Sequence, residues 1–171
     1  QIPIVYFIAP QMWVWWSNQQ EIDRLVKIAD RLLAIFPAEA RYFECLGMSV
    51  SWVGHPLIDR VQTAPNRQAA RAKLGIAPEA LSIALIPASR RQELKYLLPV
   101  MFAAAKAIQA KLPQVHFWIP LSLEVYRQPI AQAVKDYALQ ATILSGQTLE
   151  AIAAADLPLG LPAIFLKSTY L

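Results

Sequence analysis

The chain has 171 residues, of which 56% are hydrophobic and 16% are charged, and its net charge is +4. This length suits one domain or two small halves, and the low charged fraction is typical of a surface that another domain or a membrane face covers. The mild basic excess suits an anionic partner such as a phosphate, a nucleotide or an acidic lipid. The single cysteine, Cys45, excludes an internal disulfide framework. One cysteine and two histidines do not favour a metal site, so we expect none.

No stretch of the sequence is predicted to span a membrane. Residues 1–20 carry no charge, but Pro3, Pro10, Gln11 and Ser17 interrupt them. A basic leader segment is absent, so we expect no signal peptide. The sequence opens inside a predicted strand, and we therefore expect an internal fragment of a longer protein.

The first part of the chain predicts a β-α-β-α-β series. The continuous apolar run Pro3–Pro10 suits a strand that is buried on both faces. Asn18 and Glu21 have the spacing of a capping box and begin the first helix. The next elements are a strand at Arg31–Phe36, a helix from Pro37 to Gly47, and a strand with its turn at Ser49–Pro56. This alternation predicts a parallel sheet with helices on its faces.

A second alternating series follows a more polar stretch. Residues 57–71 contain Pro65 and no strand signal, and we expect them to form a linker between domains 1–56 and 72–156. A short helix at Asn66–Leu74 is expected to end at Gly75. The later elements are strands at Leu81–Ile86, Val115–Ile119 and Ala141–Leu144, and helices at Ser89–Leu112, Gln128–Leu139 and Thr148–Ala155.

The end of the sequence departs from this scheme. Pro158, Gly160 and Pro162 occupy alternate positions, which makes a poor central strand. We therefore expect the regular sequence to stop near Leu157 and residues 157–171 to be an atypical, foreign tail. A paired inner strand across residues 157–166 would contradict this expectation.

The turn after the strand at Leu81–Ile86 is the first candidate binding site. Ligands of open α/β sheets bind beyond the carboxyl ends of the strands, and Ser89, Arg90 and Arg91 follow such an end. Ser89 can cap the next helix, whose N-terminus attracts phosphate. Cations are unfavourable at a helix N-terminus, and an anionic ligand would reverse that penalty. The alternative is that both arginines are solvated and Ser89 is an ordinary cap, with Glu93 pairing either arginine.

Three further residues are weaker candidates. His55 stands between a strand end and Pro56, where it either lines a site or is a turn histidine with its ring hydrogen-bonded to backbone. Trp13 and Trp15 follow the first strand, where they either pack the sheet edge or meet acyl chains at a membrane interface. The basic residues are scattered rather than striped, so we expect no nucleic-acid partner.

Four ordered segments, "YFIAPQMWVWW", "DRLLAIFPAEARYF", "WVGHPLIDR" and "LIPASRRQEL", resemble the lipid-A-disaccharide synthases. The family usually has Phe where this chain has Ala38, and Gly where it has Ala88. Its Ser-Gly-Thr segment, expected after Asp156, is absent. The resemblance implies parts of the two Rossmann-like domains of a GT-B glycosyltransferase.

The resemblance also implies a reaction. The family transfers diacylglucosamine from its UDP-linked donor to diacylglucosamine 1-phosphate, forming a β-1,6 disaccharide and UDP with no cofactor. Ser89, Arg90, Arg91 and Glu93 would then bind donor phosphate, while Trp13, Trp15 and His55 would line the cleft. The catalytic base is expected outside this chain, and the enzyme is expected in the bacterial cytoplasm at the inner-membrane surface. The alternatives are another GT-B UDP-sugar enzyme, such as a UDP-N-acetylglucosamine epimerase, and a non-catalytic truncated remnant.

Overall fold

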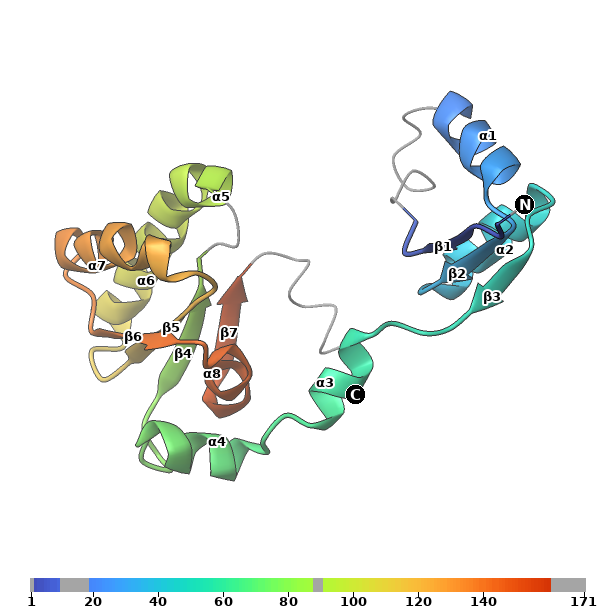
Figure 1. Cartoon of the computed structure of the whole chain (residues 1–171). Helices are drawn as coiled ribbons and strands as arrows, with labels where there is room; N and C mark the ends of the chain where they lie inside the picture. Colours follow the sequence, from blue (N-terminus) through green and yellow to red (C-terminus); the bar gives the residue numbers. More distant parts are fainter. Residues whose placement is uncertain (1, 10–18, 88–90, 161–171) are drawn as a thin grey trace. The chain divides into compact units, whose positions relative to one another are not determined.

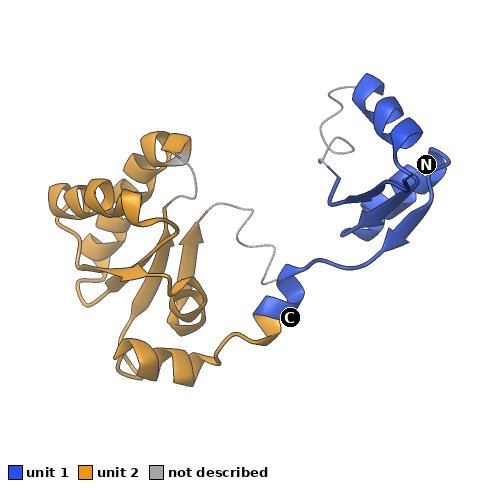
Figure 2. Ribbon diagram, in the orientation of Figure 1, with its two compact units in different colours: residues 1–60 blue, residues 61–171 orange. Residues whose placement is uncertain are grey.

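The computed structural model describes residues 2–9, 19–87 and 91–160, without the side chain of Glu93. The chain divides into two compact units, residues 1–60 and 61–171 (Figure 2). Each unit contains one parallel β-sheet with helices, so the predicted α/β fold class with parallel sheets is confirmed. The assignment of the units to two domains of a larger enzyme stays a prediction.

The first unit is built on a three-stranded sheet in the order β1-β2-β3. Leu32 in β2 lies opposite Tyr6 on one side and Val50 on the other. Phe43 packs in the centre of this unit with no exposed surface, edge-on to Tyr42. The elements are β1 (Val5–Phe7), α1 (Gln19–Ile28), β2 (Arg31–Ala34), α2 (Pro37–Cys45) and β3 (Val50–Trp52) (Figure 1).

Strand β1 is an edge strand of the first unit's sheet, and its large apolar side chains are poorly covered. Within the described residues it pairs with β2 alone. Val5 and Phe7 are 55% and 51% exposed, although both are large and apolar. Among the described residues, this edge of the sheet is therefore an apolar strand without a further partner.

Helix α2 starts where its sequence predicts. Pro37 occupies its first turn, where the missing backbone N–H removes no intrahelical hydrogen bond. The Glu39 carboxylate is buried and accepts a hydrogen bond from the backbone N–H of Ile35 at 2.9 Å. A carboxylate in the first turn also interacts favourably with the helix dipole.

Two helices occupy the stretch predicted as a linker. Helix α4 (Arg67–Leu74) agrees with its prediction: the Asn66 side chain accepts from the N–H of Ala69 at 2.9 Å, and Gly75 closes the helix with φ of 68°. Helix α3 (Leu57–Gln62) was not expected. It is only six residues long and buries none of them, so its apolar residues Leu57, Ile58 and Val61 are too few to establish a helical period.

The second unit is built on a four-stranded parallel sheet in the order β6-β5-β4-β7. The chain starts at β4, moves outward to β5 and β6, and then returns to the other side of β4. This is the beginning of a doubly wound sheet, whose ligands lie beyond the carboxyl ends of the strands. The strands are β4 (Ser82–Ile86), β5 (His116–Leu121), β6 (Ala141–Ser145) and β7 (Leu157–Gly160) (Figure 1).

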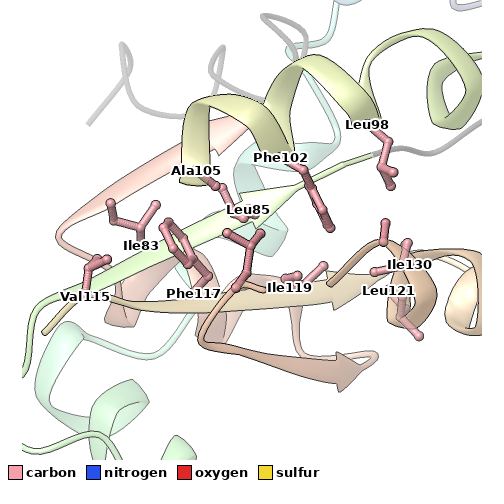
Figure 3. Packing of buried hydrophobic residues seen from close by; sticks show 12 residues of the cluster. Ile83, Leu85, Leu98, Phe102, Ala105, Val115, Phe117, Ile119, Leu121 and Ile130 are labelled. Atoms are coloured by element: carbon pink, nitrogen blue, oxygen red, sulfur yellow. The ribbon is translucent and has the colours of Figure 1, made fainter. Parts of the chain in front are cut away.

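Helices cover both faces of this sheet because side chains alternate along its strands. One face of the sheet contributes Leu85, Phe117 and Ile119 to a core cluster. They pack there with Phe102 and Ile130 (Figure 3). These two residues come from α6 (Leu98–Lys111) and α7 (Arg127–Asp136). On the other face Ala84 and Trp118 pack against α4 and α8 (Thr148–Ala154). The continuous apolar runs in the sequence reflect this two-sided burial.

The long helix predicted from Ser89 to Leu112 is wrong as a single element. Within the described residues it consists of α5 (Arg91–Tyr96) and α6, which are separated at Leu97. Pro99 explains the break, because a proline inside a helix removes one hydrogen bond and its ring clashes with the preceding turn. Placed in the first turn of a new helix, the same residue is tolerated.

The sequence after Asp156 continues the sheet for at least four residues. Leu157–Gly160 forms β7, in which Pro158 lies opposite Ala84 and Gly160 opposite Ile86. This short strand is not the paired inner strand across residues 157–166 that would contradict the expectation of an atypical tail, which stays a prediction. Within the described part of the chain β7 is an edge strand, the position where proline is tolerated. Residues 161–171 lie outside the described residues, and the origin of the tail stays untested.

A buried arginine connects four segments of the second unit by hydrogen bonds at the amino-terminal end of β4. Arg71 in α4 is 5% exposed. Its guanidinium donates to the carbonyl oxygens of Ala77, Ala80 and Ala154 and to the Ser82 hydroxyl. Buried charge is costly unless every donor is paired, and here the pairing is extensive.

Candidate functional site

The carboxyl ends of the second unit's strands form the candidate site. Strand β4 ends at Ile86, followed by the buried Pro87. Arg91 begins α5 after this strand, and it is exposed to solvent. A guanidinium beyond the end of the first strand of a doubly wound sheet is suited to an anionic group of a ligand.

Several predicted site residues lie outside the described part of the chain. They are Ser89, Arg90, Trp13 and Trp15. Glu93 belongs to α5, but its side chain also lies outside the description. The proposed roles of all five residues stay predictions.

His55 belongs to the first unit, between β3 and α3. Its Nδ1 accepts a hydrogen bond from the backbone N–H of Leu57 at 3.1 Å, and its ring lies 5.5 Å from that of Phe36. This hydrogen bond agrees with the alternative in which His55 is a turn histidine whose ring is hydrogen-bonded to the backbone. A role for His55 in a cleft stays a prediction.

A polar cluster that the sequence analysis missed bridges the ends of β5 and β6. Arg127 donates from Nε to the Glu124 carboxylate at 2.7 Å and from Nη2 at 3.1 Å. The Ser145 hydroxyl donates to the same carboxylate at 2.5 Å and accepts a hydrogen bond from Arg127. Glu124 lies in the short helix η2 (Glu124–Tyr126) after β5, and Ser145 is the last residue of β6.

The electrostatics of this cluster keep Glu124 ionised. Hydrogen bonds from Arg127 and from Ser145 lower the pKa of Glu124 to about 2. The same carboxylate raises the pKa of Arg127. At neutral pH Glu124 and Arg127 therefore form an ion pair, and the Ser145 hydroxyl is hydrogen-bonded to both. Ser145 directly follows a predicted strand, but Glu124 lies three positions beyond the end of β5, so the sequence alone does not bring them together.

A surface pocket lies at the opposite, amino-terminal edge of the same sheet. It has a volume of about 240 Å³ and is lined by residues that include Gly75, His116, Trp118 and Thr142. His116 Nε2 lies 2.8 Å from the Thr142 hydroxyl, and burial lowers the pKa of His116. The indole N–H of Trp118 has no hydrogen-bond partner among the described residues. Ligands of doubly wound sheets bind at the other edge, so we do not assign the site here.

The described residues lack both a cluster of metal ligands and a membrane-spanning helix. They contain no group of three or more His, Cys, Asp or Glu side chains that could hold a metal ion. They also contain no helix that is long and apolar enough to cross a bilayer.

Comparison with known proteins decides the family. A family described as "Lipid-A-disaccharide synthetase" matches residues 1–161. The chain belongs to the lipid-A-disaccharide synthase family. The resemblance that the sequence motifs indicated is therefore confirmed, and so is the expectation of a glycosyltransferase family of lipid A biosynthesis.

Three curated relatives named lipid-A-disaccharide synthase illustrate the similarity. The relative from Gloeothece citriformis is 60% identical over 157 residues, 92% of this chain and 41% of the relative. Those from Synechocystis sp. and Prochlorococcus marinus are 50% and 39% identical, over 91% and 94% of this chain and 40% and 42% of the relatives. The chain thus spans about 40% of the length of the synthases that it matches.

Proposed function

We propose that this chain is part of a glycosyltransferase that joins two acylated glucosamine units. The donor is UDP-diacylglucosamine, and the acceptor is diacylglucosamine 1-phosphate. The acceptor's 6-hydroxyl oxygen bonds to the donor's anomeric carbon as the bond from that carbon to the UDP oxygen breaks. The hydroxyl proton passes to a base, which we place outside these residues. The family match across residues 1–161 is the observation that carries this proposal.

In this scheme the second unit binds the donor. Its doubly wound sheet directs a nucleotide to the carboxyl ends of β4 and its neighbours. Arg91 supplies positive charge at that edge, and Ser89 and Arg90 belong to the same turn in sequence. Cationic groups at this place would stabilise the negative charge that develops on the departing UDP.

Exposed apolar side chains support the proposal of acylated substrates and a membrane surface. Tyr96 ends α5 and is 65% exposed, and Val100 in the first turn of α6 is 69% exposed. Leu123 and Val125 follow β5 and are 54% and 73% exposed. Lys95 Nζ lies 5.2 Å from the centre of the Tyr96 ring, which adds positive charge to an apolar side chain. Such a combination suits acyl chains and anionic lipid head groups. We accordingly propose that the enzyme works at the cytoplasmic face of the inner membrane.

The test is calorimetric titration of the chain with UDP, with an Arg90→Ala variant as its comparison. We expect UDP to bind the chain and the variant to bind it more weakly, because a charge-assisted hydrogen bond contributes about 1.5–3 kcal/mol. Equal affinity of the two proteins would remove Arg90 from the site. Absence of binding at millimolar UDP, with a non-cooperative thermal transition, would favour the truncated remnant.

The epimerase alternative has no comparable support. The matched family and the three relatives described above all carry the synthase name. A comparison of UDP-diacylglucosamine with UDP-N-acetylglucosamine in the same titration separates the two, since the synthase donor carries acyl chains.

A further inference from the structure

The polar cluster at the ends of β5 and β6 should contribute little to the stability of the fold. It consists of Glu124, Arg127 and Ser145. The side chains of Arg127 and Glu124 are 41% and 61% exposed. Ion pairs with this exposure contribute little to folding, because solvent screens the attraction and both side chains lose conformational freedom. Its position at the candidate site calls for a different explanation.

The strand order gives the cluster a specific place. β4 is the first strand of the doubly wound series, and β5 is the second and lies beside it. In the dinucleotide-binding members of this sheet class, the turn after the first strand holds the phosphates of the nucleotide. An acidic residue after the second strand then accepts hydrogen bonds from the ribose. Glu124 follows the last residue of β5, Leu121, by three positions.

The Glu124 carboxylate also has capacity for a ligand. An ionised carboxylate offers about four acceptor positions on its two oxygens. Among the described residues, Oε1 receives hydrogen bonds from Arg127 and Ser145, and Oε2 receives one from Arg127 Nε. The remaining position on Oε2 can accept a hydroxyl. The two partners fix the orientation of the carboxylate before a ligand arrives, which reduces the entropic cost of binding.

We propose that Glu124, oriented by Arg127 and Ser145, accepts a hydrogen bond from a ribose hydroxyl of the nucleotide donor. This inference rests on the proposed function, because it names a contact within that donor site. Glu124 is then a ligand contact, whereas Arg127 and Ser145 are positioning residues. The phosphates lie over the end of β4 and the nucleoside over the end of β5.

The experiment separates the two halves of the nucleotide. Calorimetry of the full chain compares UDP, 2′-deoxy-UDP, uridine and inorganic pyrophosphate. For Glu124→Gln we expect about tenfold weaker binding of UDP and of uridine, equivalent to about 1.4 kcal/mol. Pyrophosphate affinity should not change. The preference of the wild type for UDP over 2′-deoxy-UDP should shrink in the variant if the contacted hydroxyl is the 2′, and persist if it is the 3′.

Two further variants serve as controls. Asp136→Asn removes the same charge from the other end of α7, where Asp136 accepts a hydrogen bond from Gln132, and should bind every probe like the wild type. Ser145→Ala should weaken uridine binding, and Ser145→Thr should restore it, since a hydroxyl orients the carboxylate in both serine and threonine. Urea unfolding of each variant should give a midpoint close to that of the wild type.

The outcomes distinguish this inference from the proposed function. If pyrophosphate and UDP bind and Glu124→Gln leaves uridine and UDP affinity unchanged, the inference is overturned and the donor site stands. If the wild type binds pyrophosphate but not uridine, the inference is overturned in the same way. If neither UDP nor pyrophosphate binds, the proposed donor site is wrong and the inference falls with it.

Discussion

Arg71 and Ala154, 83 residues apart in the sequence, are joined by a hydrogen bond of 2.9 Å from the guanidinium Nη1 to the carbonyl oxygen. The bond connects α4, which precedes the second sheet, with the end of α8, which leads into its last described strand. The same guanidinium also binds the loop before β4 through Ala77 and Ala80. One buried side chain therefore holds together the amino-terminal edge of the unit, opposite the candidate site.

Arg71→Met should destabilise the protein strongly. The substitution leaves the carbonyl oxygens of Ala77, Ala80 and Ala154 without this partner, and we expect a loss of about 3–5 kcal/mol in the free energy of unfolding. Lys73→Met is the matched control in the same helix, because Lys73 pairs with Glu150 while its side chain is 56% exposed. It should cost less than about 1 kcal/mol in urea denaturation. Equal losses in the two variants would contradict the role of Arg71.

Stability should fall in acid through Asp156. Burial raises the pKa of Asp156, but hydrogen bonds from the Ser82 N–H and from Arg67, with the charges of Arg67 and Arg71, lower it below its usual value of 3.8 overall. A carboxyl with a depressed pKa in the folded state stabilises the protein above its unfolded pKa, and this contribution is lost as the pH falls below about 4. Urea midpoints between pH 6 and pH 3 measure the effect. Asp156→Asn should be less stable than the wild type at pH 6 and should lose less stability on acidification.

Substitutions at two helix ends should change the stability of the protein in opposite directions. Gly75 has φ of 68°, and a Cβ there would meet nothing within 4 Å, so Gly75→Ala tests backbone conformation by itself. We expect a loss of about 1 kcal/mol. Ala138, after α7, has φ of 52°, and Ala138→Gly should stabilise the protein by up to about 1 kcal/mol. Thermal unfolding of both variants gives the comparison, and shifts of the same sign would refute it.

Vesicle binding tests the proposed membrane surface. Val125→Asp places a charge on an exposed apolar residue beyond β5 and should reduce cosedimentation of the chain with anionic phospholipid vesicles several-fold, since burial of apolar area drives such binding. Leu112→Asp is the control, because Leu112 is exposed at the opposite edge of the sheet, after α6. An equal effect of the two substitutions would indicate non-specific electrostatic attraction.

Much of the fold could be predicted because local physics and the tertiary structure agree. Strands buried on both faces read as continuous apolar runs, as at Ser82–Ile86, where every residue is buried. Asn66 and Gly75 mark the two ends of α4 by their own chemistry. Helix α3 could not be predicted, because six residues are too few to establish a helical period. The strand at Leu157–Gly160 was missed because Pro158 disfavours a central position but not an edge.

Part of the candidate site could likewise be predicted from the sequence, and part could not. The cationic turn that includes Arg91 is visible in the sequence, because it directly follows a strand and begins a helix. The contact of Ser145 with Glu124, 21 residues earlier, depends on the adjacency of β5 and β6. Sequence reasoning can predict which strands are parallel, but their order in the sheet follows from tertiary packing. The cluster therefore became visible only in three dimensions.

The exposed outer strand of the first unit bears on how the chain behaves at high concentration. Among the described residues, Val5 and Phe7 lie in a strand that pairs with β2 alone, so its other edge and its apolar side chains can join another extended segment. We expect the isolated chain to self-associate through this strand as its concentration rises. Charged residues at positions 5 and 7 would serve as gatekeepers and keep it monomeric.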